Sequence, residues 1–355
     1  MGIIRTLFLF TGLLLALSCS CEKNLPEDET DKNPSYRFVF YNVENLFDTI
    51  NNPDTNDEEF LPEGEKNWDT DKYYDKLEQI SGVIKDIGGE QYPLLVGLCE
   101  IESRDVLEGL TLATDLKNAP YEIIHKESPD YRGIDVALLY RTDLFRLLNY
   151  KTWQVWFPFD TDYSTREVLY ACGELPGKDT IHIFVNHWPS RSGGEEETRP
   201  KRVFVAELVR SKVDSLLSLD PDARIIITGD FNDEPSDLSL MSGLKAHTSF
   251  EDPKNEHLYN LSHYLDRTSS TGSYKYRGDW NMLDQFIVSG SMMDTSGVIY
   301  TRKSDVHLFQ KDYLLERDDT FMGAKPYRTW LGDFYNGGYS DHLPVFLDIR
   351  YKPGN

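Results

Sequence analysis

The chain has 355 residues, of which 60 are Asp or Glu and 37 are Lys or Arg, so its formal net charge is −23. It contains no sustained basic run of the kind that neutralises phosphates, which excludes a strong, sequence-independent binder of DNA or RNA. Hydrophobic residues make up 39% of the chain and aromatic residues 13%, so we expect a globular protein with a large core. The acidity does not exclude an enzyme that binds phosphate through a metal cation.

Residues 1–18 have the features of a secretory signal. Arg5 precedes an apolar stretch that is shorter than the roughly 20 residues of a membrane span. The following segment 17–21 (LSCSC) resembles the lipidation site of bacterial lipoproteins, with Cys19 as the lipidated residue and Cys21 as the weaker candidate. An ordinary cleaved signal is the alternative. We therefore expect an exported outer-membrane or cell-surface lipoprotein of a Gram-negative bacterium, with a periplasmic location as the second choice.

The rest of the chain divides into a short tether and one long body. Residues 19–35 are predicted to be a flexible acidic tether, because 22–35 (EKNLPEDETDKNPS) are polar and lack a hydrophobic repeat. Residues 36–355 show no internal repeat, linker or second change of composition, and we expect them to form one domain. Cys99 and Cys172 lie in apolar segments and are predicted to be buried free thiols, although the sequence leaves a disulfide open.

Strand-like and helix-like patterns are mixed along the body. Apolar runs typical of strands occur at 36–41, 94–99, 136–140, 181–185, 223–228, 286–288 and 345–349. Apolar residues at spacings of three and four predict amphipathic helices over 73–87 and 205–217. These patterns predict an α/β protein with mixed sheets. Residues 51–71 hold eight carboxylates against one lysine, which we interpret as a solvated loop; a second metal site and a rim that rejects substrates are the alternatives.

Compact polar groups adjoin five of the strand-like runs. They are Asn42 with Glu44, Glu100, Asn186 with His187, Asp230 with Asn232 and Asp233, and Asp341 with His342. Each group alone has a structural explanation, such as a turn, a helix cap or an ion pair between Glu100 and Arg104. Ligands of open α/β sheets bind outside the strand ends, so the five groups together predict one shared site.

The residue types favour a hard metal ion. The oxygen ligands offered by Asn42, Glu100 and Asp341 are those that Mg²⁺ prefers, with Mn²⁺ or Ca²⁺ as alternatives. The sequence has no HExxH, paired CxxC, GxSxG or P-loop motif, which argues against zinc proteases, serine hydrolases and P-loop enzymes. The pattern therefore predicts metal-dependent phosphodiester hydrolysis.

Seven motifs, taken in order, resemble the endonuclease/exonuclease/phosphatase superfamily, which includes DNase I-like nucleases, abasic-site endonucleases, neutral sphingomyelinases and inositol-polyphosphate phosphatases. The motifs are YNVENLFD (41–48), LCEIE (98–102), YRGIDVALLYR (131–141), VNHWPSR (185–191), GDFNDEP (229–235), LDQFIVS (283–289) and SDHLPV (340–345). One departure is that Cys99 precedes Glu100 where the family usually has glutamine. The glutamate is kept, but a supporting hydrogen bond is in doubt.

The resemblance covers residues 36–351 and implies a fold and a metal site. The expected fold is a four-layer αββα sandwich, in which two mixed β-sheets pack face to face with helices outside. Asn42 and Glu100 would hold the divalent ion, with Asp341 nearby. The site would lie at one edge of the sheets.

The resemblance also implies roles at the scissile phosphate. His342 would act as the general base, oriented by Asp284. Asp230 and Asn232 would position the attacking water and bind the phosphate. His187 matches a histidine that assists the leaving group or binds phosphate, and two histidines are suitable acid–base partners near neutral pH. Which histidine is the base and which the acid stays open.

Four further residues are candidates for substrate binding. Arg132 and Arg191 are able to contact a phosphate, Trp280 to stack on a base, sugar or lipid, and Tyr131 lies where abasic endonucleases place a phosphate-binding tyrosine. We expect a monomeric phosphodiesterase acting on nucleic acid. The alternatives are an enzyme for phospholipid or inositol phosphate head groups and a non-catalytic surface protein. Because all the catalytic residue types are retained together, a non-catalytic surface protein is the less favoured alternative.

Overall fold

The computed structural model describes residues 33–177 and 179–352. The predicted signal peptide 1–18, the lipid site at Cys19 and most of the tether 19–35 lie outside the described residues. From Asn33 onward the chain forms one compact unit. Among the described residues, no helix has the length and apolar character needed to cross a membrane.

The first sheet has seven strands, and its parallel pair carries the N-terminal motif. Its order is β14 (Ile299–Tyr300), β20 (Val345–Tyr351), β1 (Ser35–Leu46), β2 (Leu95–Ile101), β4 (Asp135–Arg141) and β3 (Tyr121–His125), and β15 (Val306–Leu308) also pairs with β20. Strands β1 and β2 are parallel, whereas β1 and β20 are antiparallel. The carboxyl ends of β1 and β2 therefore meet at one edge.

The second sheet also has seven strands and a central parallel pair. Its order is β5 (Arg146–Trp153), β6 (Val168–Glu174), β7 (Thr180–His187), β8 (Arg224–Asp230), β13 (Asp284–Ser289), β10 (Leu258–Asn260) and β9 (Ala246–His247). Strands β7 and β8 are parallel, while β13 runs antiparallel to β8. This order places the end of β7, the end of β8 and the start of β13 next to one another.

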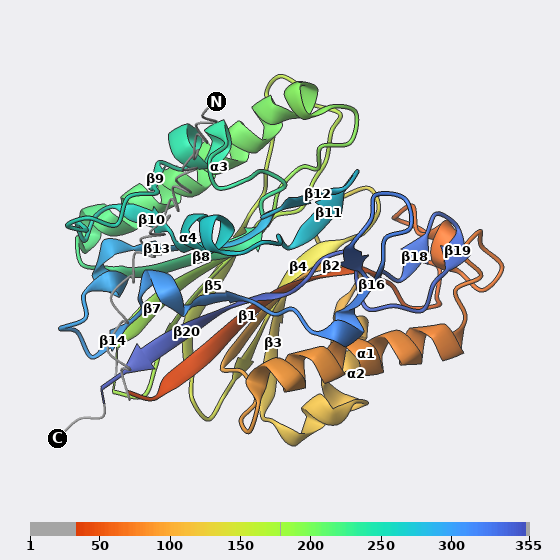
Figure 1. Ribbon diagram of the computed structural model, residues 1–355, viewed down its shortest axis with the longest axis horizontal. Helices are drawn as coiled ribbons and strands as arrows, with labels where there is room; N and C mark the ends of the chain where they lie inside the picture. The colour runs from red at the N-terminus through yellow and green to blue at the C-terminus, as the bar shows by residue number, and fades with distance from the viewer. Residues whose placement is uncertain (1–32, 178, 353–355) are drawn as a thin grey trace, which may run out of the picture. The chain divides into compact units, whose positions relative to one another are not determined.

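The two sheets pack face to face, and helices cover their outer faces (Figure 1). Along β1, Phe38 and Phe40 point into the core between the sheets, and Val39 and Tyr41 point into the core beneath the helices. This alternation is expected for a strand that is buried on both faces. The predicted four-layer αββα fold, with two mixed sheets, is confirmed.

Four α-helices and several short elements complete the described part of the chain. Helices α1 (Thr70–Gly88) and α2 (Arg104–Leu112) contribute to the core on the first sheet, α3 (Glu195–Leu219) contributes to the core on the second, and α4 (Leu261–Thr268) precedes β11. The short hairpins are β11 (Tyr274–Tyr276) with β12 (Asp279–Asn281), β16 (Leu315–Arg317) with β17 (Ala324–Pro326), and β18 (Trp330–Leu331) with β19 (Phe334–Tyr335). Short 3-10 helices occupy Glu58–Phe60, Asp115–Asn118, Gly290–Met293, Lys303–Asp305 and Asp312–Leu314, and a π-helix occupies Ser239–Gly243. Cys99 and Cys172 are both buried and free.

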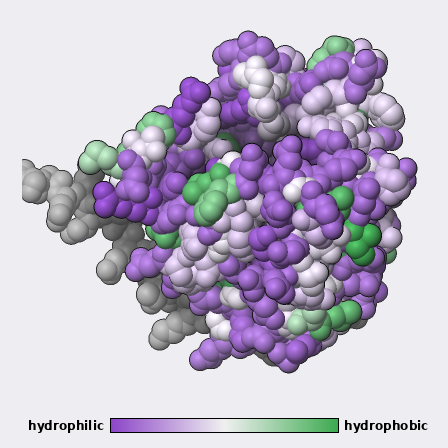
Figure 2. Space-filling model, turned by 90° about the vertical axis from the view of Figure 1, so that its right-hand side faces the viewer, coloured by the Kyte–Doolittle hydropathy of each residue, from purple (hydrophilic) through white to green (hydrophobic). Residues whose placement is uncertain are grey.

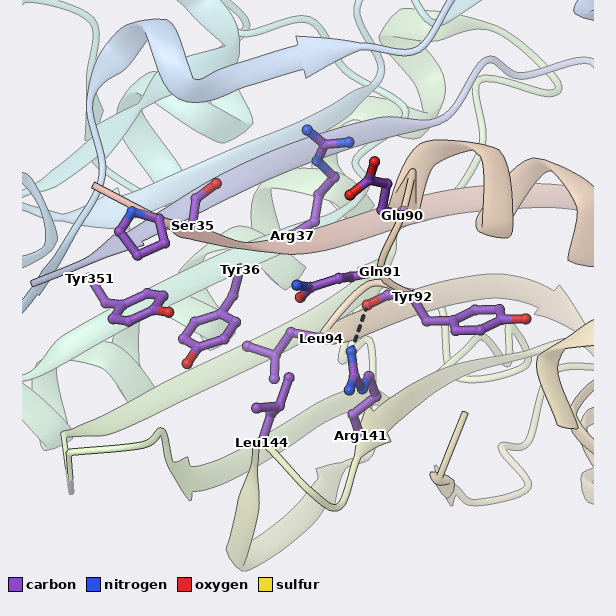
Figure 3. Close-up of a pocket in the computed structure, with 12 residues that line it drawn as sticks. Ser35, Tyr36, Arg37, Glu90, Gln91, Tyr92, Leu94, Arg141, Leu144 and Tyr351 are labelled. Atoms are coloured by element: carbon purple, nitrogen blue, oxygen red, sulfur yellow. Dashed lines mark hydrogen bonds between the residues drawn. The ribbon is translucent and has the colours of Figure 1, made fainter. Parts of the chain in front are cut away.

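A hollow of about 220 Å³ lies at the end of the first sheet that is opposite to the carboxyl ends of β1 and β2. Figure 3 shows the aromatic rings of Tyr36 and Tyr351 side by side in it, and these rings stack 4.6 Å apart. Its two arginines are already paired, Arg37 with Asp348 and Arg141 with Asp143. The hollow contains none of the predicted site residues.

Candidate active site

Asn42 and Glu100 belong to the last residues of β1 and β2, where both strands depart from regular geometry. The register between these strands shifts after Asn42, and the pairing of β2 with β4 shifts between Cys99 and Ile101. Glu44 and Glu100 have left-handed backbone angles, with φ of 52° and 63°. Such bulges re-aim a side chain that strict alternation would send to the other face of the sheet. The Glu100 carboxylate is thereby brought to the sheet edge, beside Asn42.

Residues from both sheets form one polar cluster. The Nδ2 atom of Asn42 lies 3.3 Å from Oε1 of Glu100 and 3.1 Å from Oδ2 of Asp230. His187, at the end of β7, places Nε2 at 3.9 Å from the same Glu100 oxygen and 3.6 Å from the same Asp230 oxygen. His342 places its Nε2 at 3.8 Å from Oδ2 of Asp230. The structure thus brings together side chains that are up to 300 positions apart in the sequence (342 − 42).

The two histidines have different surroundings. His342 shares a short hydrogen bond of 2.6 Å between its Nδ1 and Oδ2 of Asp284, and its ring packs 4.8 Å from that of Tyr274. Burial lowers the pKa of His342, but Asp284 and Asp230 outweigh burial and raise this pKa well above 6.5. Burial lowers the pKa of His187 well below 6.5, and nearby Arg166 lowers it further.

Asp230 lies between the two histidines and is almost fully buried. Burial raises the pKa of Asp230 to about 7; His342 opposes this shift, and the neighbouring Asp284 carboxylate adds to it. The backbone N–H of Asn232 donates to Oδ1 of Asp230 at 2.9 Å. The Asp230 carboxylate is therefore oriented by fixed donors, with Oδ2 directed toward Asn42 and the histidines.

The donor set fits a divalent cation. Among the described residues, histidines are the only partners that form ion pairs with Glu100 or Asp230, and no Lys or Arg does so. Two converging carboxylates without a fixed positive charge are the oxygen donors that a hard metal ion prefers. The Oδ1 atom of Asn42 accepts from the Glu44 backbone N–H at 3.0 Å. Coordination of an ion by Asn42 requires this amide to turn over, because an ion binds the oxygen.

Asp341 lies at the margin of this cluster. Its Oδ2 accepts a hydrogen bond of 3.0 Å from Arg328, and its side chain is 20% exposed. The neighbouring Ser340 hydroxyl donates to the Asn42 carbonyl at 2.7 Å and accepts from the His342 backbone N–H. The SDH segment is thereby tied directly to the end of β1.

Asn232 and Arg191 belong to the wall of the site. Asn232 has a left-handed φ of 51°, and its amide donates to the Trp188 carbonyl at 3.0 Å. Arg191 donates to the Asn232 carbonyl at 2.7 Å and to Asp237 at 2.9 Å. These bonds tie Arg191 to the 229–235 turn, and its predicted contact with a substrate stays a prediction.

The other predicted substrate residues lie apart from the inner cluster. Tyr131 is 60% exposed. Arg132 follows it and pairs with Asp130 at 3.7 Å. The charge of Arg132 also lowers the pKa of His187, although burial and Arg166 have larger effects. Trp280, in contrast, packs against the core on the helix side of the first sheet and near Lys275.

Arg166 and Arg328 are site residues that the sequence reasoning missed. Arg166 is buried and donates to Asp130 at 3.0 Å and to the Trp188 carbonyl at 2.6 Å, so it joins the Tyr131 turn to the segment that follows His187. Arg328 bridges Glu44 and Asp341. Neither lies in a motif that was singled out, and their partners are distant in sequence. In the sequence, each is marked only by a charged residue next to an apolar run, which is too common a pattern to indicate a site.

Comparisons with known proteins agree with this geometry. A family model described as the endonuclease/exonuclease/phosphatase family matches residues 37–351. No curated protein matches the chain.

Solved structures share the fold at low sequence identity. An endonuclease/exonuclease/phosphatase family protein from Bacteroides thetaiotaomicron has a TM-score of 0.56 at 15% identity, covering 91% of this chain and 100% of that one. A mannosyl-6-phosphatase from the same organism has a TM-score of 0.55 at 15% identity, covering 89% and 100%. TDP2 of D. rerio, complexed with a single-strand DNA product, has a TM-score of 0.54 at 12% identity, covering 89% and 99%.

Proposed function

Because the chain belongs to the endonuclease/exonuclease/phosphatase family, we propose that it is a metal-dependent phosphoester hydrolase that breaks P–O bonds with an activated water. One observation carries this proposal. The Glu100 and Asp230 carboxylates converge on Asn42 and on two histidines, and no Lys or Arg among the described residues forms an ion pair with either of them. Mg²⁺ is the proposed cofactor.

The side chains divide the chemical work. Glu100, with Asn42 and Asp341, would hold a divalent ion, which would neutralise charge on the phosphate oxygens. The Nε2 atoms of His187 and His342 lie within 4 Å of the same Asp230 oxygen. We assign to one histidine the removal of a proton from the attacking water and to the other the protonation of the leaving oxygen. Asp284 holds His342 in the orientation that this requires.

For the substrate we propose a phosphodiester, with nucleic acid as the first choice. Tyr131 is exposed, and the adjacent Arg132 acts electrostatically on His187; an exposed ring and a guanidinium suit a nucleotide and its phosphate, which supports this choice. The face at the carboxyl ends of β1 and β2 is hydrophilic over most of its area, with apolar residues in small separate patches (Figure 2). That surface favours a water-soluble phosphoester over the lipid alternative.

A substrate screen with two matched variants tests the proposed activity. Wild type is assayed with Mg²⁺, with Mn²⁺ and with a chelator on bis-p-nitrophenyl phosphate, single-stranded DNA, RNA, a sugar phosphate, inositol phosphates and sphingomyelin vesicles. We expect metal-dependent hydrolysis of the diesters, and we expect Glu100→Gln to abolish it. Glu108→Gln is the control, because Glu108 is an exposed helix residue paired with Arg104. Hydrolysis that persists in the chelator or in Glu100→Gln would refute the proposal.

We also propose that the protein is exported and carries a lipid on Cys19, on the grounds of the sequence features of residues 1–21. Metabolic labelling with a fatty-acid analogue should mark the wild type and not Cys19→Ala. Label that persists in Cys19→Ala but is lost in Cys21→Ala would move the anchor to Cys21.

A further inference from the structure

Lys76 is a buried lysine on the mostly apolar, core-facing side of α1. Its neighbours Leu77 and Ile80 belong to the core on the first sheet, and Lys76 itself has no exposed surface. Its ammonium donates to the Thr329 hydroxyl and, at 2.7 Å, to the Tyr339 carbonyl. Burying a lysine is costly unless its charge is compensated, so its place in this core requires a partner of opposite charge nearby.

Glu44 is that partner, and the two side chains meet at Thr329. The Glu44 carboxylate is 3% exposed and accepts from the backbone N–H groups of Thr329, at 2.6 Å, and Trp330, at 3.4 Å. Thr329 is thus held at its N–H by β1 and at its hydroxyl by α1. Two N-terminal elements thus contact one residue of the distant segment that leads to the SDH motif.

Arg328 extends this chain of charges into the site. Its Nε donates to Glu44 at 3.3 Å and its Nη2 donates to Asp341 at 3.0 Å. From Lys76 through Glu44 and Arg328 to Asp341, the charges alternate in sign. Among the described residues, Arg328 is the basic side chain that contacts the Asp341 carboxylate directly, while Lys76 and His342 interact with it electrostatically.

We propose that Arg328, Glu44 and Lys76 are positioning residues, which hold the Asp341 carboxylate ready for the divalent ion. The inference rests on the proposed function, because it presumes that an ion binds beside Glu100. Arg328 fixes Asp341, Glu44 fixes the guanidinium of Arg328, and Lys76 compensates the buried charge of Glu44. Helix α1, which contributes no side chain to the polar cluster, acts on the site through this connection.

Direct metal binding tests the proposal without relying on turnover. The affinity for Mn²⁺ is measured from the electron paramagnetic resonance signal of the free ion, with circular dichroism as the check of folding. Loss of a residue that orients a ligand typically weakens metal binding by about 10–100-fold. We expect Arg328→Gln and Glu44→Gln to weaken Mn²⁺ binding by this factor, and Arg328→Lys to recover part of it.

Lys85→Met is the matched control, because Lys85 lies on the same helix, is 50% exposed and pairs with Asp115. It should bind Mn²⁺ as the wild type does. Lys76→Met should weaken Mn²⁺ binding; if this variant does not fold, Thr329→Val replaces it, since it removes the hydroxyl contact and keeps the backbone N–H to Glu44.

The outcomes separate this inference from the proposed function. Folded Arg328→Gln that binds Mn²⁺ as tightly as wild type would overturn the positioning role and leave the proposed hydrolase intact. Wild type that binds no Mn²⁺ would overturn both. If these residues had a purely structural role, the folded variants would be less stable but would bind Mn²⁺ as tightly as the wild type. That result would also contradict the proposal.

Discussion

Replacing Arg166 with methionine should destabilise the protein strongly, because Arg166 and Asp130 form a buried ion pair. Their side chains are 3% and 2% exposed, and Nη1 of Arg166 lies 3.0 Å from Oδ2 of Asp130. Breaking a buried pair by removing one partner costs about 3–5 kcal/mol, since the other charge stays buried without compensation. Asp130 keeps the Arg132 backbone N–H at 3.0 Å and the longer ion pair with the Arg132 side chain at 3.7 Å, and the Trp188 carbonyl keeps the Asn232 amide as a donor. We therefore expect Arg166→Met to lower the free energy of unfolding by about 3 kcal/mol, the lower end of this range.

Urea denaturation followed by circular dichroism measures this loss, and a neighbouring ion pair supplies the control. Lys126 pairs with Glu167 at 2.8 Å and joins the same two segments of the chain, but the Lys126 side chain is 55% exposed. The Glu167 side chain is 6% exposed, but the Lys126 ammonium stays in contact with water, so Lys126→Met should lose less free energy of unfolding than Arg166→Met. If Arg166→Met and Lys126→Met lowered the free energy of unfolding by equal, small amounts, burial would not be the reason that the Arg166 pair stabilises the protein.

Three further predictions concern the site, the pH dependence and the core. Asp284→Asn should lower kcat/KM by roughly 10²-fold or more, because His342 loses the carboxylate that orients it; an unchanged kcat/KM would remove Asp284 from the mechanism. Burial lowers the pKa of His182 below its ordinary 6.5, so wild-type stability should fall as the pH drops below about 6.5, and His182→Gln should lack this part of the loss in urea titrations at several pH values. Gly173→Ala should lower the free energy of unfolding by about 1–3 kcal/mol, because a Cβ there overlaps the ring of Phe145, and an unchanged unfolding midpoint would show that the ring moves away freely.

Much of the fold was predictable because its strands and helices bury regular faces. The run 36–41 became β1, and the helical stripe over 73–87 became α1. Helix α3 begins at Glu195, ten residues before the predicted stripe at 205. Its first turns carry Glu195–Glu197 and then Pro200, so they lack the apolar repeat that marks the rest of the helix. Local periodicity reveals the buried face of a helix and misses an exposed beginning.

The sequence predicted which residues form the polar cluster, but not how their side chains are arranged. The residues stand at the ends of strands whose pairing brings them together, as for Asn186 and His187, opposite Gly229 and Asp230 in the register of β7 and β8. The backbone irregularities at Glu44 and Glu100 have no local sequence signal. The orientation of the Asn42 amide follows from its hydrogen bonds, which appear only in the folded chain.

The residues that support the site were the least predictable. Arg166 and Arg328 are indistinguishable from surface arginines in the sequence, because their ion pairs depend on partners that other segments of the chain supply. Lys76 interrupts an apolar helix face, which by itself resembles an ordinary solvated position. Only the fold shows that the Lys76 ammonium donates to Thr329 and Tyr339, and that Arg191 donates to the Asn232 carbonyl of the 229–235 turn.

The most direct test of the proposed hydrolase compares Mn²⁺ binding and bis-p-nitrophenyl phosphate hydrolysis in wild type, Glu100→Gln and Glu108→Gln. A cation site at Glu100, with Asn42 and Asp341, predicts that Glu100→Gln stays folded and loses both the ion and the hydrolysis, while Glu108→Gln keeps both. Glu100→Gln that binds Mn²⁺ and hydrolyses the diester like the wild type would contradict a catalytic metal site at this edge of the sheets.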